Sequence, residues 1–128
     1  MQIIRSEAAP PAGGHYSQAV VHAGLVYVSG QLPIDAAGRR LQSDPVEAQT
    51  RQALQNVGAI LEAAGSRIDR VLKVTVYVAD IGLWDRVNRA YAEFFGEHRP
   101  ARAVVPTGPL HFGLLVEIDA VAFVDTPR

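Results

Sequence analysis

The sequence contains no cysteine, and this absence excludes disulfide bonds, thiolate metal sites and a cysteine nucleophile. Basic clusters are also missing, because 12 Lys and Arg stand against 13 Asp and Glu, for a formal net charge of −1. Since nucleic acids are bound through concentrated positive charge, we expect no nucleic-acid partner. The four histidines show neither HExxH nor HxH spacing, so we expect no metal site.

Long apolar runs are absent as well. No run reaches the ~18 residues that span a bilayer, and the opening segment MQIIRSEAAPPAGG lacks the apolar core of a signal peptide. We therefore expect a cytoplasmic protein with no membrane partner. The composition is that of a globular chain, with 48% hydrophobic and 20% charged residues over 128 positions. Because no repeat or linker interrupts it, residues 1–128 are expected to form a single domain.

Gly and Pro divide the first half of the chain into short elements. Residues 19–22 (AVVH) and 25–30 (LVYVSG) flank a turn and predict a β-hairpin. A helix is predicted to begin at Pro45, with apolar residues at helical spacing, and to end at Gly65 in a left-handed C-terminal cap. The expected cap and capping box at its start are formed by Asp44 and Glu47.

The second half predicts a central strand, a helix and two more strands. Residues 70–80 (RVLKVTVYVAD) alternate, which places Leu72, Val74, Val76 and Val78 on one face and Val71, Lys73, Thr75 and Tyr77 on the other. An apolar stripe that begins at Trp84 and stops at Gly96 indicates a second helix. With strands at 101–105 and 114–124, the order is ββαβαββ and the fold class is α+β.

Two helices can cover only one face of the expected five-stranded mixed sheet. The predicted covered face holds Val116, Ile118, Ala120, Ala122 and Val124. The opposite face would expose more apolar area than a soluble monomer usually does, through Leu25, Tyr27, Val71, Thr75, Tyr77, Val121 and Phe123. We therefore predict a homo-oligomer built on that face, with polar chemistry beside a subunit interface where clefts are natural ligand sites. By parity, the polar residues on that face are Ser29, Lys73, Glu117 and Asp119.

Arg102 follows Pro100 and Ala101 at the start of an apolar strand. An unpaired guanidinium there would cost several kcal/mol, so Arg102 needs an anionic partner. One candidate is Glu117, in a structural salt bridge. The other is the carboxylate of a ligand, held in the bidentate fork that guanidinium geometry favours. The residues alone leave both open.

Glu117 interrupts the apolar run VEI. It is either a strand carboxylate that faces solvent or an ion pair, or a base that orients and deprotonates water. The second role works near neutral pH if burial lifts its pKa above the reference value of about 4.3. Asp119 lies about 7 Å further along the same face, a separation that glycosidase carboxylates also show. Such spacing is common in strands and weighs little.

Six motifs in this order resemble the RidA/YjgF family of reactive-intermediate deaminases, and together they cover nearly the whole chain. They are GHYSQA (14–19), YVSGQLP (27–33), QNVGAILEAAG (55–65), VNRAYAEFF (87–95), PAR (100–102) and VEIDAVA (116–122). The resemblance implies a homotrimer of chorismate-mutase-like subunits with active sites in the clefts between them. It also implies cofactor-independent hydrolysis of enamine/imine intermediates, such as 2-aminoacrylate or 2-iminopropanoate, to 2-keto acids and ammonia.

The resemblance also implies roles for particular residues. Arg102 would bind the substrate carboxylate, Glu117 would engage the attacking water and Tyr16 would line the pocket. Further substrate-binding positions would be Ser29, Gly30 and Asn88. We therefore expect Arg102 and Glu117 to meet in one pocket that a neighbouring copy helps to wall. The alternative is a trimeric module of the same fold that binds small carboxylates or protein partners without turnover.

Four positions depart from the usual family pattern: His15, Ala103, Val104 and His111. His111 adds a titratable ring and, together with Phe112, is expected to lie at the rim of the pocket. The departures therefore predict a changed substrate choice, toward a bulkier imino acid. The physiological imine and the function of the loop 106–113 do not follow from the sequence.

Overall fold

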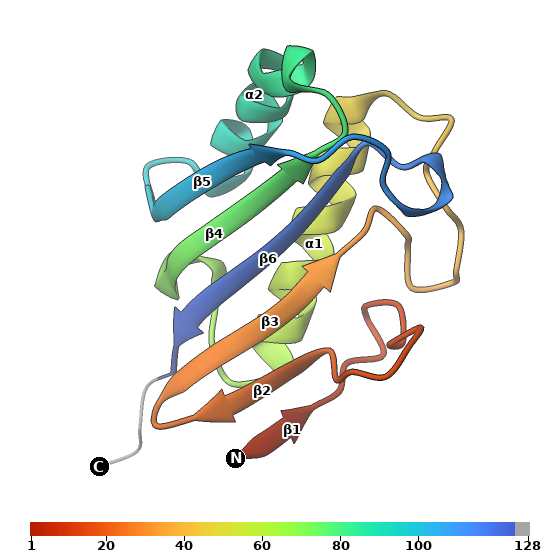
Figure 1. The fold of residues 1–128 in the computed structure, drawn as a ribbon. Coiled ribbons are helices and arrows are strands. Elements are labelled where there is room, and N and C mark those ends of the chain that lie inside the picture. The colour runs from red at the N-terminus through yellow and green to blue at the C-terminus, as the bar shows by residue number, and fades with distance from the viewer. Residues whose placement is uncertain (125–128) are drawn as a thin grey trace.

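The computed structural model describes residues 1–124 and shows an α+β fold in which two helices pack on one face of a mixed sheet (Figure 1). The sheet has six strands in the order β1-β2-β3-β6-β4-β5. Only β4 and β5 pair in parallel, and the other neighbours are antiparallel. The strands are β1 (Gln2–Ile4), β2 (Ala19–His22), β3 (Leu25–Gln31), β4 (Val71–Val78), β5 (Ala101–Pro106) and β6 (Val116–Phe123), and the helices are α1 (Val46–Ala63) and α2 (Trp84–Phe95).

The sixth strand corrects the expected count of five. Residues 2–4 form β1, which pairs with β2 at the edge of the sheet. Ile4 is buried in the core while Ile3 is exposed. A strand of three residues is too short for an alternating pattern to reveal it in the sequence, and its pairing with β2 is what stabilises it.

The start of α1 differs from the expected capping box. Pro45 has φ −57° and ψ 152° and lies just outside the helix, and no side chain caps this end. The Asp44 carboxylate instead binds Arg39 at 3.1 Å, and Glu47 binds Arg86 of α2 at 2.7 Å. The hydrogen bond from Arg86 lowers the pKa of Glu47 to about 2. Both carboxylates thus bind cations, which gives stronger hydrogen bonds than a neutral backbone N–H does.

The predicted glycine caps are confirmed. Gly65 follows α1 with φ 82°, and Gly96 ends α2 with φ 63°. Both values lie in the left-handed region, where a residue without Cβ avoids a steric penalty. The two helices therefore end where the sequence predicts.

A bulge in β4 reverses part of the predicted alternation. Val71 pairs with Ala122 and Lys73 pairs with Val121, so the register shifts between them. As a result Val71 is buried and Leu72 is 45% exposed, the opposite of the expectation for both residues. A bulge inserts one unpaired residue, and a pattern of period two cannot anticipate it.

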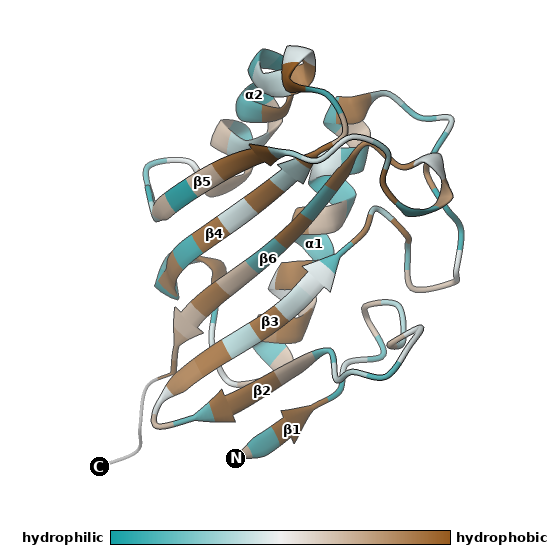
Figure 2. Ribbon diagram, in the orientation of Figure 1, coloured by the Kyte–Doolittle hydropathy of each residue, from teal (hydrophilic) through white to brown (hydrophobic). Residues whose placement is uncertain are grey.

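The core lies between the sheet and the two helices. Val116, Ile118, Ala120 and Ala122 of β6 are buried against it, as predicted. The other face of the sheet keeps aromatic residues in solvent, since Tyr27 is 46% and Phe123 38% exposed. Figure 2 shows apolar and polar residues side by side along β3, β4 and β6. Within residues 1–124, no helix is long and apolar enough to cross a membrane.

Candidate active site

Glu117 lies on the open face of the sheet. It occupies the second position of β6, opposite Tyr77 of β4. The residues on either side of it in β6 are buried against the helices, and side chains alternate along a strand, so the Glu117 side chain points away from the helices. On the other side of β6, the register of β3 shifts between Val28 and Gln31. This irregularity brings the backbone of Gly30 against the Glu117 carboxylate, so the bulge forms one edge of the site.

The approach at Gly30 leaves no room for a side chain. A Cβ built on Gly30 would lie 2.6 Å from Oε2 of Glu117, well inside van der Waals contact. A side chain at position 30 would therefore push the Glu117 carboxylate aside, and this glycine serves a close approach rather than a turn.

Replacing Gly30 with Ala is expected to displace the Glu117 carboxylate and lower activity about 10²-fold, the effect of a misplacement near 1 Å. The carboxylate is the flexible end of its side chain, so the melting temperature should change little. Gly13→Ala is the matched control, because a Cβ there would meet nothing within 4 Å. Steady-state kinetics and thermal melts on both variants test this, and wild-type activity in Gly30→Ala would contradict it.

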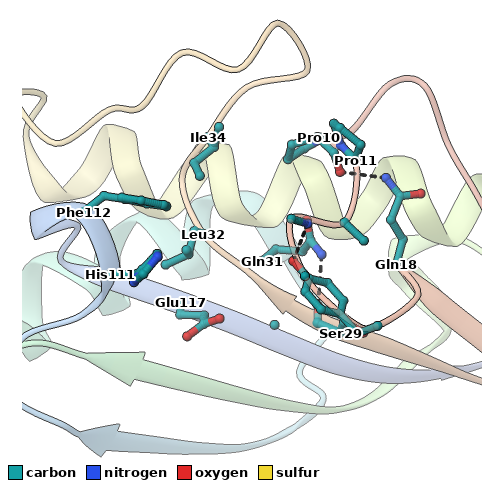
Figure 3. Close-up of a pocket in the computed structure, with 15 residues that line it drawn as sticks. Pro10, Pro11, Gln18, Ser29, Gln31, Leu32, Ile34, His111, Phe112 and Glu117 are labelled. Carbon is teal, nitrogen blue, oxygen red and sulfur yellow. Dashed lines mark hydrogen bonds between the residues drawn. The ribbon is translucent and has the colours of Figure 1, made fainter.

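A pocket of about 430 Å³ opens above Glu117 (Figure 3). Its walls come from the proline- and glycine-rich loop 10–16, from the end of β3 and the loop after it, and from the turn 111–113. Four of the six predicted site residues line this pocket: Tyr16, Ser29, Gly30 and Glu117. His111 and Phe112 also line it, as expected for residues at its rim.

The loop that carries Tyr16 is held by a buried amide. Gln18 accepts a hydrogen bond from the backbone N–H of Ser6 at 2.6 Å and donates to the carbonyls of Ser6 and Pro10. Ser29 Oγ donates to the carbonyl of Ser17 at 2.6 Å, which fixes the C-terminal end of this loop to β3. Gln18 was not singled out from the sequence, although a glutamine directly before an apolar strand is a signal that could have found it.

The environment of Glu117 raises its pKa above the ordinary value. Burial raises the pKa of Glu117, the negative charge of Asp119 raises it further, and the proximity of His111 opposes both effects. The burial effect is the one that the role of water base requires. Asp119 is itself fixed, because the Tyr77 hydroxyl donates to its carboxylate at 3.2 Å.

Arg102 and Asn88 lie together, but on the other side of the sheet. Arg102 of β5 is opposite Val74 of β4, which faces the helices. Its Nη1 donates to Oδ1 of Asn88 at 2.8 Å, and its guanidinium lies 4.7 Å from the ring centroid of Tyr91. Within this chain Arg102 and Glu117 therefore do not meet, so the expected shared pocket does not form in a single chain. The alternative expectation, a structural salt bridge between Arg102 and Glu117 within the chain, is therefore wrong as well.

The position of Arg102 leaves it available to another molecule. The strand β5 is at the edge of the sheet, and within residues 1–124 Arg102 pairs with no carboxylate. The Tyr91 hydroxyl beneath it is buried and has no hydrogen-bond partner among the described residues. Burial raises the pKa of Tyr91 to about 12, although the Arg102 charge opposes this. The guanidinium thus rests on an aromatic surface, and its one hydrogen bond to the described residues is the bond to Asn88.

The described part of the chain contains no group of three or more His, Asp or Glu that could hold a metal ion. The chemistry available on these residues is that of a half-buried carboxylate in a pocket and a guanidinium–amide pair at the sheet edge. Together with the fold, these features define a class of small α+β proteins that carry a pocket on the open face of the sheet and an arginine at the sheet edge.

The particular family follows from comparison. The family model described as Endoribonuclease L-PSP matches residues 6–124, and the chain belongs to this family, which is the RidA/YjgF family that its motifs resemble. A RutC family protein from Pyrococcus horikoshii is 42% identical over 122 residues, covering 95% of this chain and 97% of the relative. The human 2-iminobutanoate/2-iminopropanoate deaminase is 41% identical over 121 residues, covering 94% and 88%. Among solved structures, E. coli TdcF with bound serine is similar with a TM-score of 0.91 and 34% identity, covering 98% of this chain and 100% of that one.

Proposed function

We propose that this chain is a cofactor-independent deaminase that hydrolyses enamine/imine intermediates of the 2-aminoacrylate and 2-iminopropanoate type to 2-keto acids and ammonia. The observation that carries this proposal is the half-buried Glu117 at the base of an open pocket, with a pKa raised by burial. The human and bovine relatives that bear the name of such a deaminase support the general activity. A carboxylate of this kind suits a base that acts near neutral pH.

The catalytic site is completed by a second copy of the chain. One protomer holds Glu117 and Arg102 on opposite faces of its sheet, so a substrate that needs both must lie between protomers. In the proposed homotrimer, the open face of one subunit receives the β5 edge of the next, and Arg102 and Asn88 face the pocket of Glu117. The exposed Tyr27 and Phe123 support burial of that face, and Arg102 supports it by lacking a carboxylate partner within residues 1–124.

The reaction needs little beyond positioning. Arg102 and its unused donors hold the substrate carboxylate as a bidentate pair, with Asn88 fixing the guanidinium. Glu117 orients one water and takes its proton while the oxygen attacks the imine carbon. The nitrogen receives that proton, which gives a neutral carbinolamine. Glu117 then takes the proton of the carbinolamine hydroxyl and passes it to the nitrogen, so that the C–N bond breaks as the carbonyl forms and ammonia and the 2-keto acid are released. Tyr16, Ser29 and Gly30 shape the pocket around the reacting carbon.

Asp119 sets the pH range of this chemistry. Its negative charge raises the pKa of Glu117, so Asp119→Asn should lower that pKa and keep the base ionised in more acidic solution. The acid limb of the pH–kcat/KM profile is expected to move to lower pH, with the alkaline limb unchanged. Glu93→Gln, an exposed change on α2, is the control. An acid limb that stays in place would show that Glu117 does not titrate in this profile.

The alternative is a trimeric module that binds small carboxylates, or a protein partner, without turnover. The E. coli TdcF structure holds bound serine, a small molecule on a similar fold, and this favours binding as a candidate. The family description also names a ribonuclease, although no Arg or Lys stands among the described residues that line this pocket in a single chain.

One experiment separates these candidates. An amino-acid oxidase or dehydratase generates the imine in place, and its loss is followed with and without the protein. Deamination predicts faster loss and matching ammonia release. A binder predicts an unchanged rate together with thermal protection by 2-keto acids, and a ribonuclease predicts cleavage of added RNA.

A further inference from the structure

The turn beside the pocket holds a bulky residue in an unfavourable conformation. Phe112 has φ 61° and ψ 18°, and Gly113 follows with φ 71°. A left-handed backbone is sterically unfavourable for a residue with a side chain. The ring of Phe112 is 40% exposed, so burial in the core does not explain the conformation. Backbone strain of this kind persists where surrounding contacts hold it, commonly at functional sites.

Contacts on both sides hold the Phe112 ring over the pocket. The Arg40 guanidinium carbon lies 3.5 Å from its centroid, and the His111 ring centroid is 3.9 Å away. Arg40 forms a β-bridge with Ile34, which lines the same pocket. The Phe112 turn and the loop after β3 are thus joined across the rim.

Two buried amides of α1 fix these two walls. Asn56, 1% exposed, donates to the backbone carbonyls of Leu32 and Ile34 at 3.1 and 2.8 Å. Gln49, fully buried, accepts from the backbone N–H of Leu115, just after the Phe112 turn, at 2.9 Å. Hydrogen bonds to buried side chains of α1 therefore hold both segments in place. Figure 3 shows Leu32, Ile34 and Phe112 on the side of the pocket above Glu117.

We propose that Leu32, Ile34 and Phe112 form a side-chain subsite that selects imino acids with large apolar side chains, of the leucine- or phenylalanine-derived type. Phe112 is its specificity-determining residue. The inference rests on the proposed deaminase function and names its substrate class. The methylene of 2-aminoacrylate leaves this apolar wall in water, whereas a branched or aromatic side chain covers it. Burial of the larger side chain is expected to favour the larger imine by about 10-fold or more.

The test compares imines that an amino-acid oxidase generates from alanine, leucine and phenylalanine. Wild-type protein is expected to show a kcat/KM about tenfold higher or more for the larger imines. Phe112→Ala should lower the ratio of large to small by about tenfold, and Phe112→Tyr, which keeps the ring, should preserve it. Ile81→Ala is the control, because Ile81 is 55% exposed and lies outside the pocket lining. A ratio that favours the alanine imine, or one unchanged in Phe112→Ala, overturns the proposal.

A second readout keeps the subsite testable if no imine is hydrolysed. The 2-keto acids of leucine and alanine are titrated into wild type and Phe112→Ala, and thermal shifts give the apparent affinity ratio. Tighter binding of the larger keto acid, lost in Phe112→Ala, supports the subsite even where the deaminase function fails. Equal affinities for the two keto acids overturn the subsite alone.

Discussion

Glu117→Gln is expected to lower kcat for imine hydrolysis by about 10²–10⁴-fold, the usual contribution of a general base. The amide keeps the size of the side chain and its place beside Gly30 but cannot take a proton from water. Glu93→Gln, on the exposed surface of α2, controls for a charge change of the same kind. Single-turnover and steady-state assays measure the effect, and a variant as active as wild type would remove Glu117 from the mechanism.

The same substitution has an expected effect on stability, with a defined sign. Because burial raises the pKa of Glu117 above its ordinary value of 4.5, the folded chain binds this proton more tightly than the unfolded chain does. As pH rises through the interval between the unfolded and folded pKa values, ionisation then favours the unfolded state. Glu117→Gln should therefore melt at a higher temperature than wild type at neutral pH. The difference should vanish well below the unfolded pKa.

Arg102→Lys is expected to lower kcat/KM about 10²-fold, mainly through a higher KM. An ammonium keeps the charge but lacks the planar fork, so it cannot bind the substrate carboxylate and Asn88 in the same geometry. A misplaced carboxylate also moves the imine carbon away from the water. Arg99→Lys, at an exposed neighbouring position, is the control. Equal kinetics in wild type and Arg102→Lys would reject the role of the guanidinium.

Mixing two inactive variants tests whether the site lies between subunits. Arg102→Ala and Glu117→Gln are unfolded together and refolded, so that mixed assemblies contain some clefts with both wild-type residues. Part of the activity is expected to return, because each cleft takes the two groups from different chains. The two variants refolded separately and then combined are the control. No gain over that control would place both groups in the site of one chain or would exclude subunit mixing.

The sequence predicted the elements that carry strong local signals. Both helices, the hairpin of β2 and β3 and the covered face of β6 are confirmed, since apolar spacing and the glycines at 65 and 96 specify them locally. The motif positions also located Tyr16, Ser29, Gly30 and Glu117, which share one pocket.

Features that depend on distant partners were not predictable in this way. The cap of α1 is absent because Glu47 binds Arg86, 39 residues away. The bulge at Leu72 shifts the register of β4 against β6, and the alternation of apolar and polar residues in the sequence does not reveal it. Alternation within β5 does not predict which face of the sheet Arg102 lies on. That face depends on how β5 is aligned with β4 and β4 with β6. The separation of Arg102 from Glu117 is visible only once that register is known.

The two amides of α1 have a mechanical consequence for the pocket. Asn56 binds the loop after β3 and Gln49 binds the backbone of Leu115, so one helix holds both segments from positions about two turns apart. Because both hydrogen bonds originate on one helix, a shift of α1 is expected to move the two bound segments together rather than to open the pocket between them.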